Sequence, residues 1–266
     1  MKVLFLAAIL FAVPALDAQR DEDDWLEDCR DHDSRRRVAF CEVRHSGYSQ
    51  RSGGTFAAEP VRNGGVSVRG WDRDSVHVEA RIRAVARTEE AARELAREVR
   101  IAANRGTLGA EGPSSNRDHN WNVSFIVYVP RQTNVRAETQ NGPIGLTELD
   151  GNIDVRATNG PISLRDLAGD VRARAQNGPI TIRLSGSRWR GVGLDAETQN
   201  GPMVLYVPEG YNAQLETGTQ NGPMSIGFPI TVQGRGLESR ITTTLGSGGP
   251  TIRARTHNGP LAIRRP

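Results

Sequence analysis

The chain has 266 residues, with 34 Lys and Arg residues against 31 Asp and Glu residues, and a formal net charge of +3. This near balance of charge argues against nucleic acid as a partner. The 29 glycines and 14 prolines mark a chain with many turns, but glycine does not recur at every third position, so a collagen-like structure is excluded.

The first 18 residues have the pattern of a secretory signal peptide. Lys2 precedes eleven apolar residues, Val3 to Val13, and Ala18 closes a short stretch that contains small residues. The apolar run is too short to cross a bilayer, and no later segment is long and apolar enough to do so. We therefore predict residues 1–18 to be a cleaved signal peptide. The mature protein is expected in the periplasm, on the cell surface or outside the cell, without a membrane span.

Residues 19–37 are predicted to form a linker, because eight of the thirteen residues from 21 to 33 are Asp or Glu. Export makes a disulfide between the two cysteines, Cys29 and Cys41, the favoured interpretation. Closing that short loop would stabilise the fold by about 3 kcal/mol in the chain-entropy model. A zinc site that includes His32 is the alternative, but two cysteines and one histidine do not have a recognised zinc spacing.

Residues 38–130 are predicted to form an N-terminal cap of strands with one helix. Apolar residues alternate with polar ones in the segments 66–68 and 76–82, as expected for strands. Thr88 followed by Glu89 and Glu90 predicts the start of a helix over about 88–97, because Thr caps a helix and acids favour its first turn.

Residues 131–266 contain an internal repeat. The tripeptide Asn-Gly-Pro occurs six times at spacings of 18, 18, 23, 21 and 37 residues. The six repeats begin at Asn141, Asn159, Asn177, Asn200, Asn221 and Asn258. Gly248-Gly249-Pro250 is a degenerate copy, and Asn63-Gly64-Gly65 is an outlying one. On both sides of each tripeptide the apolar residues alternate with polar ones, which predicts two strands per repeat, each with one buried face.

Each Asn-Gly-Pro is predicted to be a corner between stacked strands. Asn-Gly is a strong hairpin signal, but the residue after the glycine of a two-residue hairpin must donate its backbone N–H, which proline lacks. The predicted fold class is therefore all-β: a single-stranded-type β-solenoid of roughly 18-residue rungs with Asn-Gly-Pro corners, plus the small α/β cap. The repeated Asn side chains are expected to point inward and to hydrogen-bond from rung to rung as structural corner residues. The alternative, which is compatible with the first, is that Asn and Gly are present because they tolerate the left-handed backbone of a corner.

Charges on the outward positions also favour stacking. Arg136, Asp154, Arg172 and Asp195 occupy equivalent positions of successive repeats and alternate in sign, as opposite neighbours on adjacent strands should. Stacking in chain order leaves Asp195 beside Glu216, a pair of like charges. The last three residues, 264–266, are expected to blunt the final sheet edge.

Three stretches of this chain resemble the bacterial putative adhesin family, a family of exported β-strand-repeat proteins with a domain of unknown function. They are the segment 63–74 (NGGVSVRGWDRD), the Asn-Gly-Pro-Ile rungs, and the closing segment 245–260. The resemblance covers residues 55–266 and implies a β-solenoid at the cell envelope or surface. It brings no catalytic residues with it.

The sequence favours a binding protein over an enzyme. It contains no nucleophile motif and no spacing of histidines typical of a metal site, so no cofactor is expected. The predicted function is a non-enzymatic exported binding scaffold of the cell envelope. One alternative is an envelope-stress or sensor component that binds a lipid, peptide or protein, and a second is a polysaccharide-active solenoid enzyme. The partner is left open among a surface glycan, a lipid and a protein.

Two groups of residues are the predicted contact sites. Trp189 is flanked by Arg188 and Arg190 in an insertion between repeats, and an indole there can stack on a ligand, although packing in the core is the commoner fate of a tryptophan. Arg156 and Arg174 occupy equivalent positions on adjacent rungs and form a basic patch, although such charges more often keep a sheet face solvated.

Overall fold

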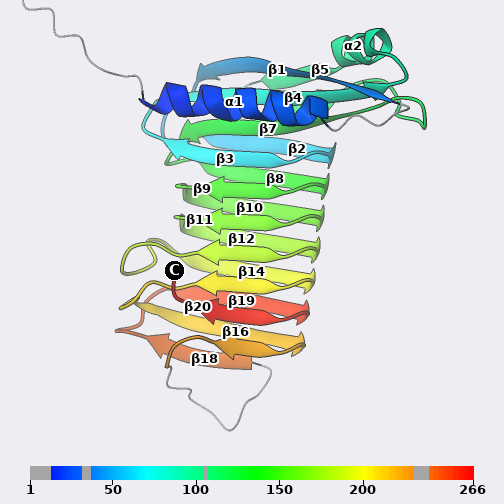
Figure 1. Ribbon diagram of the computed structural model, residues 1–266. Helices are drawn as coiled ribbons and strands as arrows, with labels where there is room; N and C mark the ends of the chain where they lie inside the picture. Colours follow the sequence, from blue (N-terminus) through cyan, green and yellow to red (C-terminus); the bar gives the residue numbers. More distant parts are fainter. Residues whose placement is uncertain (1–12, 32–36, 105–106, 230–239) are drawn as a thin grey trace, which may run out of the picture.

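The computed structural model describes residues 13–31, 37–104, 107–229 and 240–266, and most of them lie in strands of two large sheets (Figure 1). This confirms the all-β class. The strands of the first sheet, in spatial order, are β1 (Val38–Ser49), β4 (Ser75–Ala86), β7 (Asn120–Pro130), β3 (Val66–Trp71), β9 (Ile144–Thr147), β11 (Ile162–Arg165), β13 (Ile180–Arg183), β15 (Met203–Tyr206), β20 (Leu261–Arg264) and β17 (Met224–Ile226).

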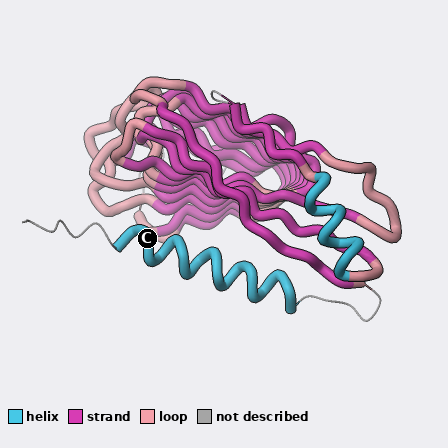
Figure 2. The backbone as a smooth tube through the Cα atoms, turned by 90° about the horizontal axis from the view of Figure 1, so that it is seen from above, coloured by secondary structure: helices cyan, strands magenta, loops and turns pink. Residues whose placement is uncertain are grey.

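The second sheet faces the first, and the view from above shows the two layers with the strands of successive repeats superposed (Figure 2). Its strands, in spatial order, are β18 (Arg240–Leu245), β16 (Ala213–Asn221), β19 (Thr251–Asn258), β14 (Gly193–Asn200), β12 (Ala168–Asn177), β10 (Asp150–Asn159), β8 (Asn134–Asn141), β2 (Thr55–Asn63), β6 (Thr107–Glu111) and β5 (Arg100–Asn104). Both sheets are mixed, because β1, β4 and β7 pair antiparallel, as do β5 with β6 and β16 with β18.

Strands of successive repeats pair in parallel and in register. In the second sheet Ile153 of β10 lies opposite Val135 of β8 and Val171 of β12. In the first sheet Ile162 of β11 lies opposite Ile144 and Ile180. The two strands on either side of one Asn-Gly-Pro belong to different sheets, so they do not form a hairpin with each other. The expectation that each strand pairs with its equivalent in a neighbouring repeat is therefore met in this part of the chain.

The proline of the tripeptide needs no N–H in this arrangement. The backbone of Ile162 donates to the carbonyl of Pro179 at 2.9 Å, and Ile180 donates in the same way to Pro202 at 3.0 Å. Each proline thus takes part in the inter-repeat hydrogen bonds only through its carbonyl oxygen, which any residue supplies.

We expect Pro179→Ala to leave the fold intact and to lower the free energy of unfolding by no more than about 1 kcal/mol. Pro179 is exposed, and the loss comes from the greater freedom of the unfolded chain. Urea denaturation followed by circular dichroism measures the change. A loss of several kcal/mol would mean that the proline ring itself holds the turn.

Glycine in the tripeptide is required by the close approach of successive turns. A Cβ atom on Gly160 would collide with the carbonyl oxygen of Gly142, and one on Gly178 would collide with that of Gly160. Gly160 and Gly178 are not among the positive-φ residues, and the described non-glycine residues with positive φ are Glu148 and Asp166. At Gly160 and Gly178 the lack of space, and not a left-handed backbone, therefore selects glycine, whereas Gly201 and Gly259 of later tripeptides also have a positive φ of 154°.

The asparagines of the tripeptides form a ladder of side-chain hydrogen bonds along one edge of the molecule. Nδ2 of Asn159 donates to Oδ1 of Asn141 at 3.0 Å, and Nδ2 of Asn177 donates to Asn159 at 3.0 Å. The same bond continues through Asn200, Asn258 and Asn221 at 2.8–2.9 Å, and it begins from Asn63 at 3.2 Å. These side chains are exposed, so the inward orientation expected from strand alternation is wrong. Alternation ends at Asn because the chain turns there.

The hydrophobic core lies between the two sheets. Columns of equivalent apolar residues fill it, and each member is almost completely buried. One column consists of Ile144, Ile162, Ile180, Met203 and Leu261, and the facing column consists of Val135, Ile153, Val171, Leu194 and Ile252. Complete burial of such side chains contributes about 1.5–3 kcal/mol each.

Stacking departs from chain order at the C-terminal end. β19 lies between β14 and β16, and β20 lies between β15 and β17. The last strand of the chain is therefore internal to its sheet, and β17 and β18 occupy the edges. The expectation that residues 264–266 blunt a final edge is wrong, because β20, which ends at Arg264, lies between β15 and β17. β17 and β18 both come before β19 and β20 in the chain, yet they lie outside them in the two sheets.

The N-terminal region covers the other end of both sheets. Helix α2 (Glu89–Glu98) begins after Thr88, whose side chain accepts a hydrogen bond from the backbone of Ala91 at 3.2 Å. Its buried residues are Ala92, Leu95 and Ala96, which pack over β4 and β1. The helix expected over 88–97 is thus present one residue further along the chain.

Helix α1 (Val13–Asp31) differs from the expected linker over residues 19–37, because residues 19–31 are helical. Trp25 and Leu26 pack against a small cluster with Val85, and Arg81 lies 5.5 Å from the centre of the Trp25 ring. Arg81 also contacts Asp21 at 3.1 Å. Through these contacts the acidic segment packs against the folded strands. Its composition alone did not indicate such packing. Residues 1–12 of the predicted signal peptide lie outside the described residues.

The disulfide between Cys29 and Cys41 is present and ties α1 to β1, with the two Cα atoms 6.4 Å apart. His32, considered for a zinc site, lies outside the described residues. None of the helices in the described part of the chain combines the length and the apolar character needed to cross a bilayer.

Candidate functional site

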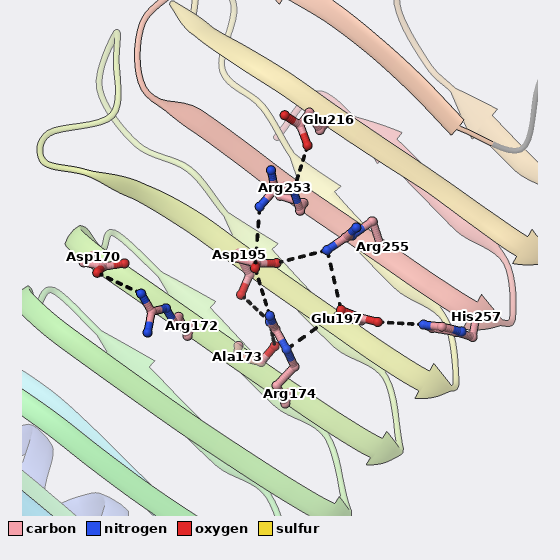
Figure 3. Close-up of polar contacts among 10 residues, drawn as sticks. All are labelled: Asp170, Arg172, Ala173, Arg174, Asp195, Glu197, Glu216, Arg253, Arg255 and His257. Atoms are coloured by element: carbon pink, nitrogen blue, oxygen red, sulfur yellow. Dashed lines mark hydrogen bonds and ion pairs between the residues drawn. The ribbon is translucent and has the colours of Figure 1, made fainter.

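A network of alternating charges covers the outer face of the second sheet over β12, β14, β19 and β16 (Figure 3). Strand alternation directs Asp195 and Glu197 of β14 outward, because the residues between and beside them are buried. Arg253 of β19 lies opposite Asp195, and Arg255 lies opposite Glu197. In-register pairing therefore places basic side chains beside acidic ones.

Asp195 is the centre of this network. Its carboxylate accepts a hydrogen bond from Arg174 of β12 at 2.8 Å, and it forms ion pairs with Arg253 at 3.7 Å and with Arg255 at 3.8 Å. Arg253 donates to Glu216 of β16 at 2.7 Å, and this hydrogen bond is the main cause that raises the pKa of Arg253 above its usual value. One carboxylate thus links guanidinium groups from strands on both sides of it.

The strand order removes the like-charge pair expected between Asp195 and Glu216. β19 lies between β14 and β16, so Arg253 is placed between the two carboxylates and contacts both. The prediction of adjacent like charges is therefore wrong, and the correction has an electrostatic reason. Stacking in chain order would bring two carboxylates to neighbouring strands, whereas insertion of β19 turns a repulsion into two attractions.

Glu197 connects the network to His257 at the end of β19. A carboxylate oxygen of Glu197 lies 2.6 Å from Nε2 of His257, and the other lies 3.6 Å from Arg255 and 3.8 Å from Arg174. The Nδ1 atom of His257 lies 3.1 Å from Oε1 of Gln220 on β16. The charged face thus ends in a group of acid, imidazole and amide side chains.

A polar groove lies beside this group, between β14, β19, β16 and β18. Its volume is about 490 Å³, within the range of small-molecule binding sites. The lining residues are Glu197, Gly218, Thr219, Gln220, Arg240, Arg255, Thr256 and His257. Gly218 of β16 lies opposite Arg255 on one side and opposite Arg240 on the other. A residue without a side chain therefore separates two arginines on this face.

The two arginines of the groove differ from those in the rest of the network. Arg255 forms ion pairs at 3.6–3.8 Å but donates no hydrogen bond within the described residues, and its Nε atom is buried without a partner. Arg240 is exposed and has no polar partner in the part of the chain that the structure describes. Arg240 therefore keeps its donors for a ligand, and Arg255 keeps those of its terminal nitrogens, because its buried Nε cannot reach the groove.

The structure does not bring the predicted contact residues together as expected. Trp189 is only 4% exposed, and its indole N–H donates to the carbonyl of Gly169 at 3.0 Å, so it is part of the core. The expected stacking surface on this indole is wrong, because the insertion folds back onto Gly169. Arg188 and Arg190 are exposed on either side of it.

Arg156 and Arg174 are neighbours in register, as the repeat predicts. Arg156 is exposed and forms an ion pair with Asp154 at 3.0 Å, whereas Arg174 is held by Asp195 and Glu197. The basic patch is therefore largely neutralised by carboxylates of its own and the next strand.

The groove residues Glu197, Arg255, Arg240, Gln220 and His257 were not predicted as site residues from the sequence. One signal was available. Gly218 occupies an outward position at which each of the five other repeats has a charged residue. Its position beside Arg255 could not be inferred, because that depends on the insertion of β19.

No family model and no curated protein sequence matches the chain. Solved structures with a similar chain path include "a putative cell adhesion protein" from Clostridium sporogenes, at 11% identity and a TM-score of 0.49, covering 85% of this chain and 100% of that one. "A putative adhesin" from Bacteroides fragilis follows at 12% identity and a TM-score of 0.34, covering 85% and 97%. A "putative lipid binding protein" from Parabacteroides distasonis has 12% identity and a TM-score of 0.24, covering 85% and 96%. Identities this low transfer no activity.

Proposed function

We propose that the protein is an exported, non-enzymatic binding scaffold of the cell envelope, built as a β-solenoid with Asn-Gly-Pro corners. One observation carries the proposal: equivalent strands pair in parallel and in register, so outward side chains form continuous columns with a spacing of about 4.8 Å. Such a face is preorganised for contact with a partner, because its side chains are held by neighbours before binding.

Several features support rigidity of this face. The ladder of asparagine side chains joins every Asn-Gly-Pro turn to the next. The ion pairs centred on Asp195 join four adjacent strands across the outer surface. A scaffold that is ordered before binding loses little conformational entropy when the partner arrives.

Export is supported by two further features. The predicted signal peptide over residues 1–18 has the charge and apolar pattern of a secreted precursor. The disulfide between Cys29 and Cys41 persists in oxidising compartments such as the periplasm or the extracellular space.

Binding of the purified full chain to arrayed glycans, to lipid vesicles and to isolated cell envelopes tests the proposal. We expect saturable binding to at least one of these surfaces, and no release of reducing ends from any bound glycan. Absence of binding to all three surfaces, or turnover of a glycan, would contradict a non-enzymatic scaffold.

A further inference from the structure

The groove between Arg255 and Arg240 has the chemistry of a site for an acidic sugar. Resting on the proposed scaffold function, we propose that it binds a saccharide that carries a carboxylate, such as a uronic acid unit of a polysaccharide. Arg255 and Arg240 both lie opposite Gly218, so they stand on the two strands that flank β16.

These two cations have free hydrogen-bonding capacity. Arg255 has ion pairs no shorter than 3.6 Å, and within the described residues Arg240 has no polar partner. Guanidinium groups bind carboxylates through paired N–H donors in a planar fork. A ligand carboxylate above Gly218 would meet donors from both sides. In the other repeats a charged side chain fills the equivalent outward position.

The remaining wall of the groove is formed by polar side chains. Glu197, Gln220 and His257 supply acceptors and donors beside the arginines, and Thr219 and Thr256 complete the lining. Sugar hydroxyl groups both donate and accept, so they match such a mixed set. The groove has no apolar side chain for an acyl chain, which disfavours an anionic lipid. A densely charged polyanion is disfavoured by the carboxylate of Glu197.

A peptide cannot add to the sheet as a further strand beside β16. β16 is paired with β19 on one side and with β18 on the other, so its backbone offers no free edge to an extended chain. Recognition at the groove must therefore use side chains. This is the mode expected for a saccharide that lies across a sheet face rather than along its edge.

Isothermal titration of the full chain with a short uronic-acid oligosaccharide tests the proposal, with a neutral oligosaccharide of equal length as the comparison. We expect the acidic oligosaccharide to bind more tightly than the neutral one. Arg240→Ala should weaken binding about tenfold, since it removes a charge-assisted hydrogen bond. Arg240 makes no contact that the fold requires, so this variant should unfold at the wild-type temperature.

Arg136→Ala is the matched control, because Arg136 of β8 is also an exposed arginine on the outer face of the same sheet but lies outside the groove. Its affinity should stay within twofold of wild type. A second variant, Arg255→Gln, should weaken binding by a similar factor to Arg240→Ala.

Equal affinity of Arg240→Ala and wild type would overturn the proposal, as would equal binding of the neutral and acidic oligosaccharides. A preference for anionic vesicles or for acidic peptides over the uronic-acid oligosaccharide would also overturn it. In each of these cases the scaffold function would survive, because it requires only that the protein bind some surface. Absence of binding to any surface would instead contradict the scaffold itself.

Discussion

Gly160→Ala should lower the free energy of unfolding by about 3 kcal/mol, at the upper end of the usual cost of overpacking. The added Cβ atom would overlap the backbone carbonyl of Gly142 in the preceding turn. Backbone atoms cannot move aside as a flexible side chain can, and the N–H of Gly142 is itself held by the carbonyl of Asn159 at 3.0 Å. The two strands that follow must therefore separate or the turn must distort. Equilibrium urea denaturation of the full chain measures this loss.

Gly145→Ala is the matched control for this substitution. Gly145 lies in β9, where the nearest atom to an added Cβ is Oγ of Ser67 at 3.6 Å, an ordinary contact. Because alanine restricts the unfolded chain more than glycine does, this change should be neutral or stabilise by up to about 1 kcal/mol. A similar loss at both positions would show that glycine matters for flexibility and not for the close approach of the turns.

Ile162→Ala should lower the free energy of unfolding by about 2–5 kcal/mol. Ile162 lies in β11, is 1% exposed, and has Ile144 and Ile180 as its neighbours in the core column. Both neighbours are fixed by their own strands, so the space left by the missing atoms cannot close. The same denaturation experiment measures the change. The slope of the free energy of unfolding against urea concentration should equal that of wild type, since the folded and unfolded states expose the same surface.

Ser163→Ala in the same strand provides the comparison, because Ser163 is exposed on the outer face. Its expected effect is within about 0.5 kcal/mol, as for most surface substitutions. If Ile162→Ala lowered the free energy of unfolding by less than about 0.5 kcal/mol, the assignment of Ile162 to the buried face of β11 would be wrong.

The repeat could be found from sequence because it depends on local chemistry. Alternation of apolar residues predicted which face of each strand is buried, and the columns around Ile162 have that burial. Proline after Asn-Gly excluded a hairpin because it has no N–H, and the strands on either side of each tripeptide lie in different sheets. The helix after Thr88 was also predictable, since its cap and apolar stripe lie within a few residues of each other.

Other features depended on contacts between distant segments. The acidic segment around Trp25 is helical because Arg81 and a cluster with Val85 lie beneath it. Trp189 was a candidate contact residue because it lies between two arginines in an insertion, but Gly169 of another strand accepts its N–H and the side chain is buried. Neither partner is close in the sequence, so neither contact could be read from the local pattern.

In the candidate site, too, some features were predictable from the sequence and others depended on the tertiary structure. From the sequence alone, outward columns of opposite charge were predicted, because strand period and repeat length determine which side chains become neighbours. Only the tertiary structure decided that β19 enters between β14 and β16, which places Arg253 between two carboxylates and Arg255 beside Gly218. The physical reason is that an inward apolar pattern is satisfied equally well by any order of equivalent strands, whereas the charges on their outer faces favour only some of those orders.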